Sequence, residues 1–288
     1  MPTFDTPKPI LASVEMDGAV VRFLAEDRRD TVVGVQPVDR SRDLDVRIAR
    51  QTKVSFADGQ LTVKAPKQYP VFSRGGNVEI TIALPAGSQI EASVNWGDLV
   101  TEGRLGECRV KAASGSIHMD EAGPVWLTAN SGNITVGRAV GHTEAATSSG
   151  NLRFHSIDGP AVLKNTHGAT TVTDVTDALT VMGATGDITV ERAHASVSAT
   201  ATHGRLRIGE VARGTVVLES NTGSIEIGVR EGTGAYLDVS SADGRVHNTL
   251  AATEVPGDAE DTVEVRARTK YGQIDIRRAR STGWVDTA

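Results

Sequence analysis

Hydrophobic and polar residues alternate along most of this chain, and a turn containing glycine interrupts the alternation about every eighteen residues. Two and four residues after a turn stand apolar pairs such as Ile134/Val136, and seven and five residues before it stand pairs such as Val125/Leu127. Because alternate residues of a strand share one face, these positions predict inward-facing columns. The residues between them, such as Asn133, predict an outward polar set.

The turn glycines recur at spacings of 17 to 21 residues, within similar strings such as SGSI, SGNI and SGNL. They are Gly97, Gly115, Gly132, Gly150, Gly168, Gly186, Gly204, Gly223 and Gly244, with a further occurrence at Gly272. Such a period indicates a repeat architecture, and β-propeller blades need longer repeats of about 40 residues. The pattern predicts an all-β fold, a single-stranded β-solenoid with about 18 residues per coil. Right-handed coiling, as in a right-handed β-helix, is favoured by the hand of parallel crossovers.

Outside these columns, local patterns predict further elements. Ile10–Val14 and Ala19–Leu24 are expected to be two strands around a turn at Asp17-Gly18. The alternation of Leu44, Val46 and Ile48 with charged residues predicts another half-buried strand. Aliphatic residues seven positions after the glycine, among them Ile157, predict a third inward corner or short strand in each coil.

These patterns divide the chain into three segments. We expect a β-rich cap with the first coils at 1–90, and regular solenoid repeats at 91–278 with an acidic insertion at 249–262. A polar tail follows at 279–288. Exposed coils at the ends of a solenoid usually need terminal caps, and the two ends of the chain are the candidates.

Composition narrows the classes of function. A net charge of −6 and a pI near 5.7 argue against nucleic-acid binding. The single cysteine, Cys108, excludes an intramolecular disulfide and a cysteine-based zinc cluster. No apolar run reaches the ~18 residues of a membrane-spanning helix, and the first residues do not have the pattern of a signal peptide. We therefore expect a cytoplasmic location and no membrane span.

The succession IALPAGSQIEASVNWGDL, followed by SGSI, SGNI and SGNL, resembles a bacterial β-strand-repeat family of unknown function. Members of that domain family carry the name "putative adhesin". The resemblance covers most of the chain and implies the β-repeat fold. The adhesin name implies a role at a surface, and the family has no agreed catalytic residues.

Carboxylates form a candidate acidic edge five to eight residues after the glycines. Its residues are Asp120, Asp158, Asp174 and Glu191. Paired carboxylates can hydrolyse glycosides or bind calcium. Arg138 and Arg192 fall on the same edge, so a mixed, solvated face is the favoured interpretation.

A second candidate is the loop at 64–77, where proline and glycine interrupt the alternation. Tyr69, Phe72 and Arg74 combine rings and a guanidinium, which are enriched in binding hot spots. The favoured alternative is that the two rings cap the first coils. His167 and His203 occupy equivalent positions two coils apart, too distant to share a zinc ion, and we predict no metal or cofactor.

The sequence therefore predicts a non-enzymatic β-solenoid that works as a binding or scaffolding protein, with a protein or glycan as the expected partner. Two alternatives stay open. One is a polysaccharide-acting hydrolase or lyase that uses the acidic edge. The other is a structural protein that self-assembles through the unpaired strands at the ends of the solenoid.

Overall fold

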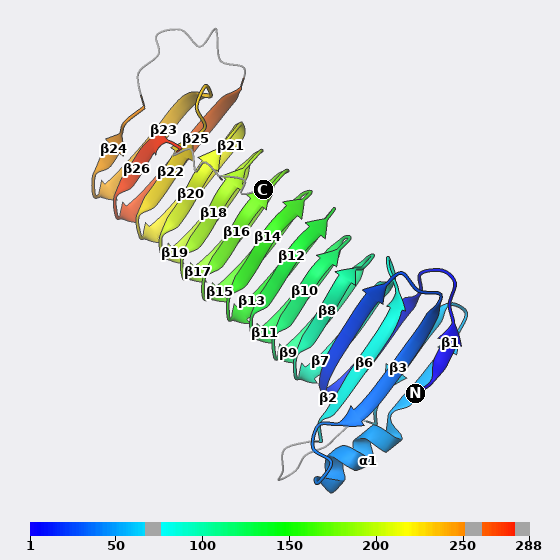
Figure 1. Ribbon diagram of the computed structural model, residues 1–288. Coiled ribbons are helices and arrows are strands. Elements are labelled where there is room, and N and C mark those ends of the chain that lie inside the picture. Colours follow the sequence, from blue (N-terminus) through cyan, green and yellow to red (C-terminus); the bar gives the residue numbers. More distant parts are fainter. Residues whose placement is uncertain (67–75, 251–260, 280–288) are drawn as a thin grey trace, which may run out of the picture. The chain divides into compact units, whose positions relative to one another are not determined.

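The computed structural model describes residues 1–66, 76–250 and 261–279, and most of them lie in β-strands (Figure 1). The chain divides into two compact units, Met1–Asp158 and Gly159–Ala288. In each unit successive strands alternate between two sheets, here called A and B, and stack in parallel on the equivalent strands of the next coil. The predicted β-solenoid is confirmed. Its right-handed coiling and the division at residues 90 and 278 stay predictions.

The regular coils of the first unit place the strand before each turn glycine in sheet B and the strand after it in sheet A. Their strands are β7 (Gln89–Trp96), β8 (Leu99–Arg104), β9 (Cys108–Ser114), β10 (Ile117–Ala122), β11 (Val125–Ser131), β12 (Ile134–Val140), β13 (Thr143–Ser149) and β14 (Leu152–Asp158). The predicted inward columns are buried, and the side chains of Ile134 and Phe154 are fully enclosed.

Each coil has two strands, so the predicted third corner is wrong. Ile157 is buried as expected, but it lies in β14 together with Leu152 and Phe154. Ile157 is three positions after Phe154, so strict alternation would turn its side chain outward. The pairing of β12 with β14 is interrupted between these two positions, and this irregularity returns the side chain to the core.

Close stacking explains the turn glycines. A Cβ on Gly132 would lie 2.0 Å from the carbonyl oxygen of Gly115, and its φ of 147° is one that side chains rarely adopt. Gly244 lacks the positive φ of the other predicted turn glycines, yet a Cβ there would lie 1.9 Å from the carbonyl oxygen of Gly272. A Cβ at this position therefore requires the last coil to shift away from Gly272.

The polar residue after the glycine holds neighbouring coils together. The Asp98 carboxylate accepts a hydrogen bond from the Ser116 amide of the next coil at 2.7 Å. Asn133 Oδ1 accepts from the Asn151 amide at 2.8 Å, and Asp187 in the second unit repeats the arrangement. The strings SGN and TGD are therefore structural and are not a displayed recognition motif.

The first coil is formed by β2 (Leu11–Glu26), which is one continuous strand, so the predicted turn at Asp17-Gly18 is wrong. Leu11–Gly18 pairs with β7 in sheet B and Ala19–Glu26 with sheet A, so the strand crosses between the sheets while staying extended. A Cβ on Gly18 would lie 2.2 Å from Nε1 of Trp96, so glycine is needed here for space.

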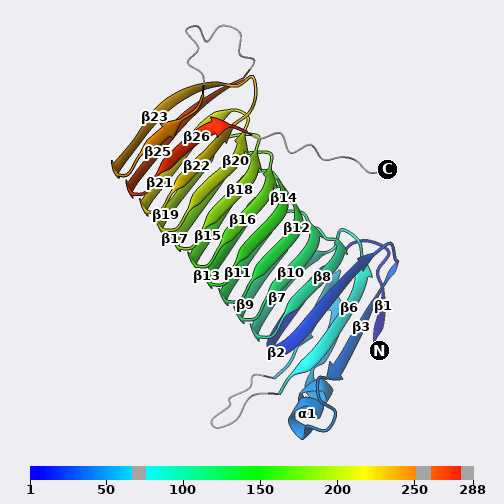
Figure 2. The same cartoon turned by 60° about the vertical axis from the view of Figure 1, so that its left-hand side comes forward.

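Strands that break the parallel pattern cover this end of the first unit, called here the covered end. In sheet A, β6 pairs with β2, then β3 and β1 follow in antiparallel order; in sheet B, β5 pairs with β2 and β4 is antiparallel to β5. Their bounds are β1 (Thr3–Asp5), β3 (Asp30–Pro37), β4 (Lys53–Ala57), β5 (Gln60–Lys64) and β6 (Val78–Pro85). A helix, α1, lies beside β3 and β6 (Figure 2).

The helix α1 (Asp43–Gln51) replaces the strand predicted from Leu44, Val46 and Ile48. Leu44 and Ile48 are four residues apart, so a helix also places them on one face. Both side chains pack closely against Gly76. A Cβ on Gly76 would lie only 3.0 Å from a carbon atom of each. The buried carboxylate of Asp45 accepts hydrogen bonds from the amides of Asp39 and Asn77, which fixes the helix to the start of β6.

The second unit continues the same two-strand coil. Its strands are β15 (Ala161–His167), β16 (Thr170–Val175), β17 (Leu179–Thr185), β18 (Ile188–Ala193), β19 (Val197–His203), β20 (Leu206–Val211), β21 (Gly214–Thr222), β22 (Ile225–Val229), β23 (Gly234–Asp243), β24 (Val246–Asn248), β25 (Thr262–Tyr271) and β26 (Ile274–Arg278). The inward columns are again buried, from Leu179 and Val181 to Val265 and Ala267.

The last coils do not follow chain order. Strand β25 lies between β21 and β23 (Figure 2), and β26 lies between β22 and β24 (Figure 1). The coil formed last in the sequence is therefore inserted between the two coils that precede it. The coil of β23 and β24 becomes the end of the unit, called here the open end, and the turn glycines stack in the order Gly223, Gly272, Gly244.

Candidate functional site

The predicted acidic edge is a set of ion pairs between neighbouring coils. Asp158 accepts from Arg138 at 2.8 Å, and Asp174 accepts from Arg192 at 2.7 Å. Glu191 pairs with Arg207 at 3.1 Å. The fourth residue, Asp120, accepts from the amide of Gly103 at 3.1 Å. Each predicted carboxylate therefore already has a structural partner.

These partners make the carboxylates of the edge less suitable as catalytic groups. The hydrogen bond that Arg138 donates to Asp158 raises the pKa of the Arg138 guanidinium, which stays protonated. A general acid for glycoside hydrolysis needs a carboxyl group with a raised pKa, which is usually produced by an apolar pocket. A nearby arginine acts in the opposite direction. The geometry thus supports the mixed, solvated face that was the favoured interpretation.

Histidines and the thiol add no convergent chemistry. His194 contacts the Asp174 carboxylate at 3.3 Å, beside Arg192. Within the described residues, no group of three His, Cys, Asp or Glu side chains is close enough to hold a metal ion. Cys108 is fully buried, and burial raises the pKa of its thiol to about 12. A thiol with this pKa is a core group and a poor nucleophile.

An aromatic cluster lies on the outer face of sheet B in the first unit. The guanidinium of Arg109 lies over the Trp126 ring, 4.1 Å from its centroid. The His142 ring, which precedes β13 on the other side, has its centroid 5.6 Å from the indole centroid. A shallow groove of about 680 Å³ extends from this cluster across β2, β7 and β9. Because Trp126 already has these two partners, little of its ring is left for a ligand.

The loop residues Tyr69, Phe72 and Arg74 lie outside the described residues. The same holds for most of the acidic insertion, from 251 to 260, and for the tail from residue 280. The proposal that these segments make contacts stays a prediction.

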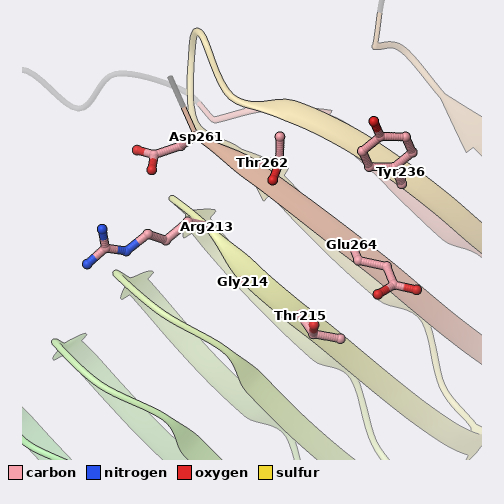
Figure 3. Close-up of a pocket in the computed structure, with 7 residues that line it drawn as sticks. All are labelled: Arg213, Gly214, Thr215, Tyr236, Asp261, Thr262 and Glu264. Carbon is pink, nitrogen blue, oxygen red and sulfur yellow. The ribbon is translucent and has the colours of Figure 1, made fainter. Parts of the chain in front are cut away.

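A second hollow, of about 720 Å³, lies on the outer face of sheet B in the second unit, where the inserted coil meets its neighbours (Figure 3). Thr215, Glu264 and Tyr236 occupy one row across β21, β25 and β23, because Glu264 is the register partner of both other residues. Arg213 and Asp261 lie at the other end of the hollow, with Thr262 between the two groups (Figure 3).

The side chains of this hollow are accessible and chemically mixed. The Tyr236 side chain is 55% exposed, although it lies in the middle of a strand. The Glu264 carboxylate accepts from Arg266 at 2.7 Å. Arg213 and Asp261 have no ion pair among the described residues. An aromatic ring with a guanidinium, two carboxylates and two hydroxyl groups around it can bind a polar ligand that also has an apolar face.

Sequence reasoning missed this site for a physical reason. Its residues come from 213–215, 236 and 261–264, and they meet because β25 is inserted between β21 and β23. Local alternation with the inward-facing Leu237 is consistent with the outward position of Tyr236. It carried no information on which coil would lie beside it.

Fold and hollow together define a β-solenoid repeat protein with an open surface site. The chain belongs to the Toastrack DUF4097 family, whose model matches residues 13–281. This match confirms the resemblance to a β-strand-repeat family of unknown function. No curated protein matches the sequence. In the described residues, no helix is both long and apolar enough to cross a membrane.

Solved structures with a similar arrangement share little sequence with this chain. A "putative adhesin" from Bacteroides fragilis is 13% identical with a TM-score of 0.40, covering 96% of this chain and 95% of its own. A "putative adhesin" from Parabacteroides merdae is 9% identical with a TM-score of 0.30 at the same coverages. A "putative lipid binding protein" from Parabacteroides distasonis is 9% identical with a TM-score of 0.31, covering 97% and 96%.

Proposed function

We propose that this chain is a non-enzymatic binding protein, and that the hollow between β21, β25 and β23 is its ligand site. The observation that carries the proposal is the exposed ring of Tyr236 beside Glu264 and opposite Arg213. In the regular coils, the carboxylates of the predicted acidic edge already bind groups of neighbouring coils. This hollow instead combines an exposed ring with charged groups from three strands.

The chemistry of the hollow favours a glycan as the ligand. A sugar ring has an apolar face that can stack on an exposed aromatic side chain, and its hydroxyl groups can donate to carboxylates and accept from a guanidinium. The hydroxyl groups of Thr215 and Thr262 add two further partners. An adhesin-like role, which several of the similar solved proteins carry in their names, agrees with a ligand of this class.

The test is binding of the full chain to an array of neutral and acidic glycans, followed by calorimetry with the glycans retained. We expect Tyr236→Ala and Arg213→Ala each to weaken binding at least tenfold. Tyr271→Ala is the matched control, because Tyr271 is 59% exposed but does not line the hollow. This variant should bind like the wild type.

Three results would contradict the proposal. The first is that no glycan on the array binds. The second is that Tyr236→Ala and Tyr271→Ala have equal effects, which would place the contact elsewhere. The third is turnover of a retained glycan that Glu264→Gln abolishes, which would favour the hydrolase alternative.

A further inference from the structure

The open end of the second unit exposes two strand edges. Within the described residues, β23 pairs with β25 alone and β24 with β26 alone. Val246 is 43% exposed, whereas Ile274 and Ile225, which follow it in the same inward column, are fully buried. A long edge with exposed apolar side chains beside it presents free backbone donors and acceptors to another strand.

We propose that this open end binds a second copy of the chain. β23 pairs antiparallel with β23 of the second copy, and β24 lies beside its own equivalent. A two-fold axis perpendicular to the sheets produces both contacts at once. It places sheet A of one copy beside sheet A of the other, does the same for sheet B, and reverses the strand direction. The interface is isologous, as in most two-fold dimers.

The sequence of β23 selects the register. Opposite residues of antiparallel strands share a face, so inward residues must meet inward residues. Two registers pair nearly all of β23 under this condition, one centred on Asp238 and one on Val239. The first places two carboxylates opposite each other, which is destabilising. The second places Val239 against its equivalent and Asp238 against Ser240, so it is the register we propose.

Charge and packing also agree with the Val239 register. Asp238 is paired with Arg268 of its own chain at 3.3 Å, so little negative charge faces the second copy. Inside the solenoid the half-buried side chains of Leu237 and Val239 would become enclosed, as Val265 and Ala267 are in the neighbouring strand.

A closed dimer is favoured over a filament. A filament needs the open end of one copy to pair with the covered end of the next. There the edge strand of sheet B is β4, with five residues against ten in β23, and α1 lies beside β3 and β6 of sheet A. Short edge strands and a covering helix are devices that prevent edge pairing. The open end of one copy therefore pairs with the open end of the second copy.

Cross-linking tests the register directly. Opposite residues in an antiparallel pair have Cα atoms about 4.5–5.5 Å apart, within the range that a disulfide spans. Val239→Cys should therefore form a covalent dimer under mild oxidation. Asp238→Cys is the control, because its equivalent is displaced along the strand and lies across from Ser240. The native Cys108 is fully buried and should not interfere.

Sedimentation of the full chain over a concentration series tests the dimer itself. The wild type should show a reversible dimer, and Val246→Lys should weaken association at least tenfold. Val140→Lys is the matched control, because Val140 on β12 is 40% exposed and belongs to the first unit, not to the open end of the second. It should dimerise like the wild type.

Several outcomes would overturn the inference. They are a wild type that stays monomeric at its highest soluble concentration, assembly beyond the dimer, or stronger cross-linking through Asp238→Cys than through Val239→Cys. Because the hollow lies on the outer face of the sheet and the dimer uses its edge, Tyr236→Ala should leave dimerisation intact. Failure of the glycan proposal and failure of the dimer are thus distinguishable.

Discussion

The covered end and the open end solve the same problem in different ways. A parallel coil always leaves unpaired backbone groups at its last strands. At the covered end, β3 and β4 return antiparallel to β6 and β5, and α1 lies beside them. At the open end, β23 and β24 keep the parallel order and a free edge. The first end is built to stop pairing, whereas the second keeps the geometry that pairing needs.

The comparison also shows where side chains with special roles are found. At the covered end, Asp45 is buried and accepts backbone hydrogen bonds, so its charge serves the fold. In the coils next to the open end, Tyr236 and Tyr271 are both more than half exposed. Tyrosine rings are enriched at interfaces, because one end of the side chain is apolar and the other is polar. The comparison indicates that contacts with a ligand or partner lie where the order of the coils departs from the order of the sequence.

The largest predicted effect compares a glycine inside the stack with one at the open end. Gly132→Ala should lower the free energy of unfolding by about 3 kcal/mol or more, because a Cβ meets a backbone carbonyl at 2.0 Å and the φ is strained. Gly244→Ala should cost about 1 kcal/mol, since its φ is not strained and, among the described residues, no coil lies beyond it, so the last coil can shift. Urea unfolding followed by circular dichroism measures both. Equal losses would mean that the open end is as constrained as the interior.

A second prediction concerns the covered end. Asp45→Ala should lower the free energy of unfolding by about 2 kcal/mol, because the amides of Asp39 and Asn77 lose a charged acceptor in a buried position. Asp43→Ala is the control: this residue is exposed in the first turn of the same helix and should cost about 0.5 kcal/mol. Urea unfolding again gives the values. If the two variants were equally stable, Asp45 would not anchor the helix.

The sequence predicted those parts of the fold that each coil repeats. The inward columns and turn glycines could be identified because one position, such as Ile134 or Gly132, has an equivalent in every coil. The irregular parts had no such support. The alternation of Leu44, Val46 and Ile48 covers five residues and fits either a strand or a helix, and the long-range contacts of Asp45 favoured the helix.

The candidate site was less predictable than the fold. The acidic edge could be predicted from the spacing to the turn glycines, but the ion pairs of Asp174 and Asp158 follow from the register between coils. The hollow depends on the insertion of β25, a pairing between distant segments that leaves no local pattern. Glycine spacing indicated only that the repeat becomes irregular after Gly223.

A third prediction contrasts a thiol inside the coils with one near the open end. Burial raises the pKa of Cys108 from 9.0 to about 12. The unfolded chain releases this proton at lower pH than the folded chain. The contribution of Cys108 to stability is therefore fully present below pH 9.0 and is lost as the pH rises towards 12. Urea unfolding between these pH values, with Cys108→Ala as the reference, measures this loss.

Thiol labelling near pH 8 completes this contrast. Cys108 in the folded wild type should resist an aromatic disulfide reagent, because it is fully buried. A cysteine introduced by Tyr271→Cys, where the native side chain is 59% exposed, should react like a free thiol. Fast labelling of Cys108 in the native protein would show that the interior coils open as readily as the last ones.

The smallest predicted effect tests whether the acidic edge has more than a structural role. Asp174→Asn removes an ion pair with Arg192 that is partly exposed, and such pairs contribute about 0–1 kcal/mol. Asp238→Asn, which removes the more exposed pair with Arg268 near the open end, should cost no more. Urea unfolding at low and high salt measures both, and salt should reduce the two losses. A loss above about 2 kcal/mol at Asp174 alone would mean that its contacts with Arg192 and His194 act as a coupled network. In that case the edge would have to be reconsidered as a functional site, because exposed ion pairs on a solvated face do not contribute that much to stability.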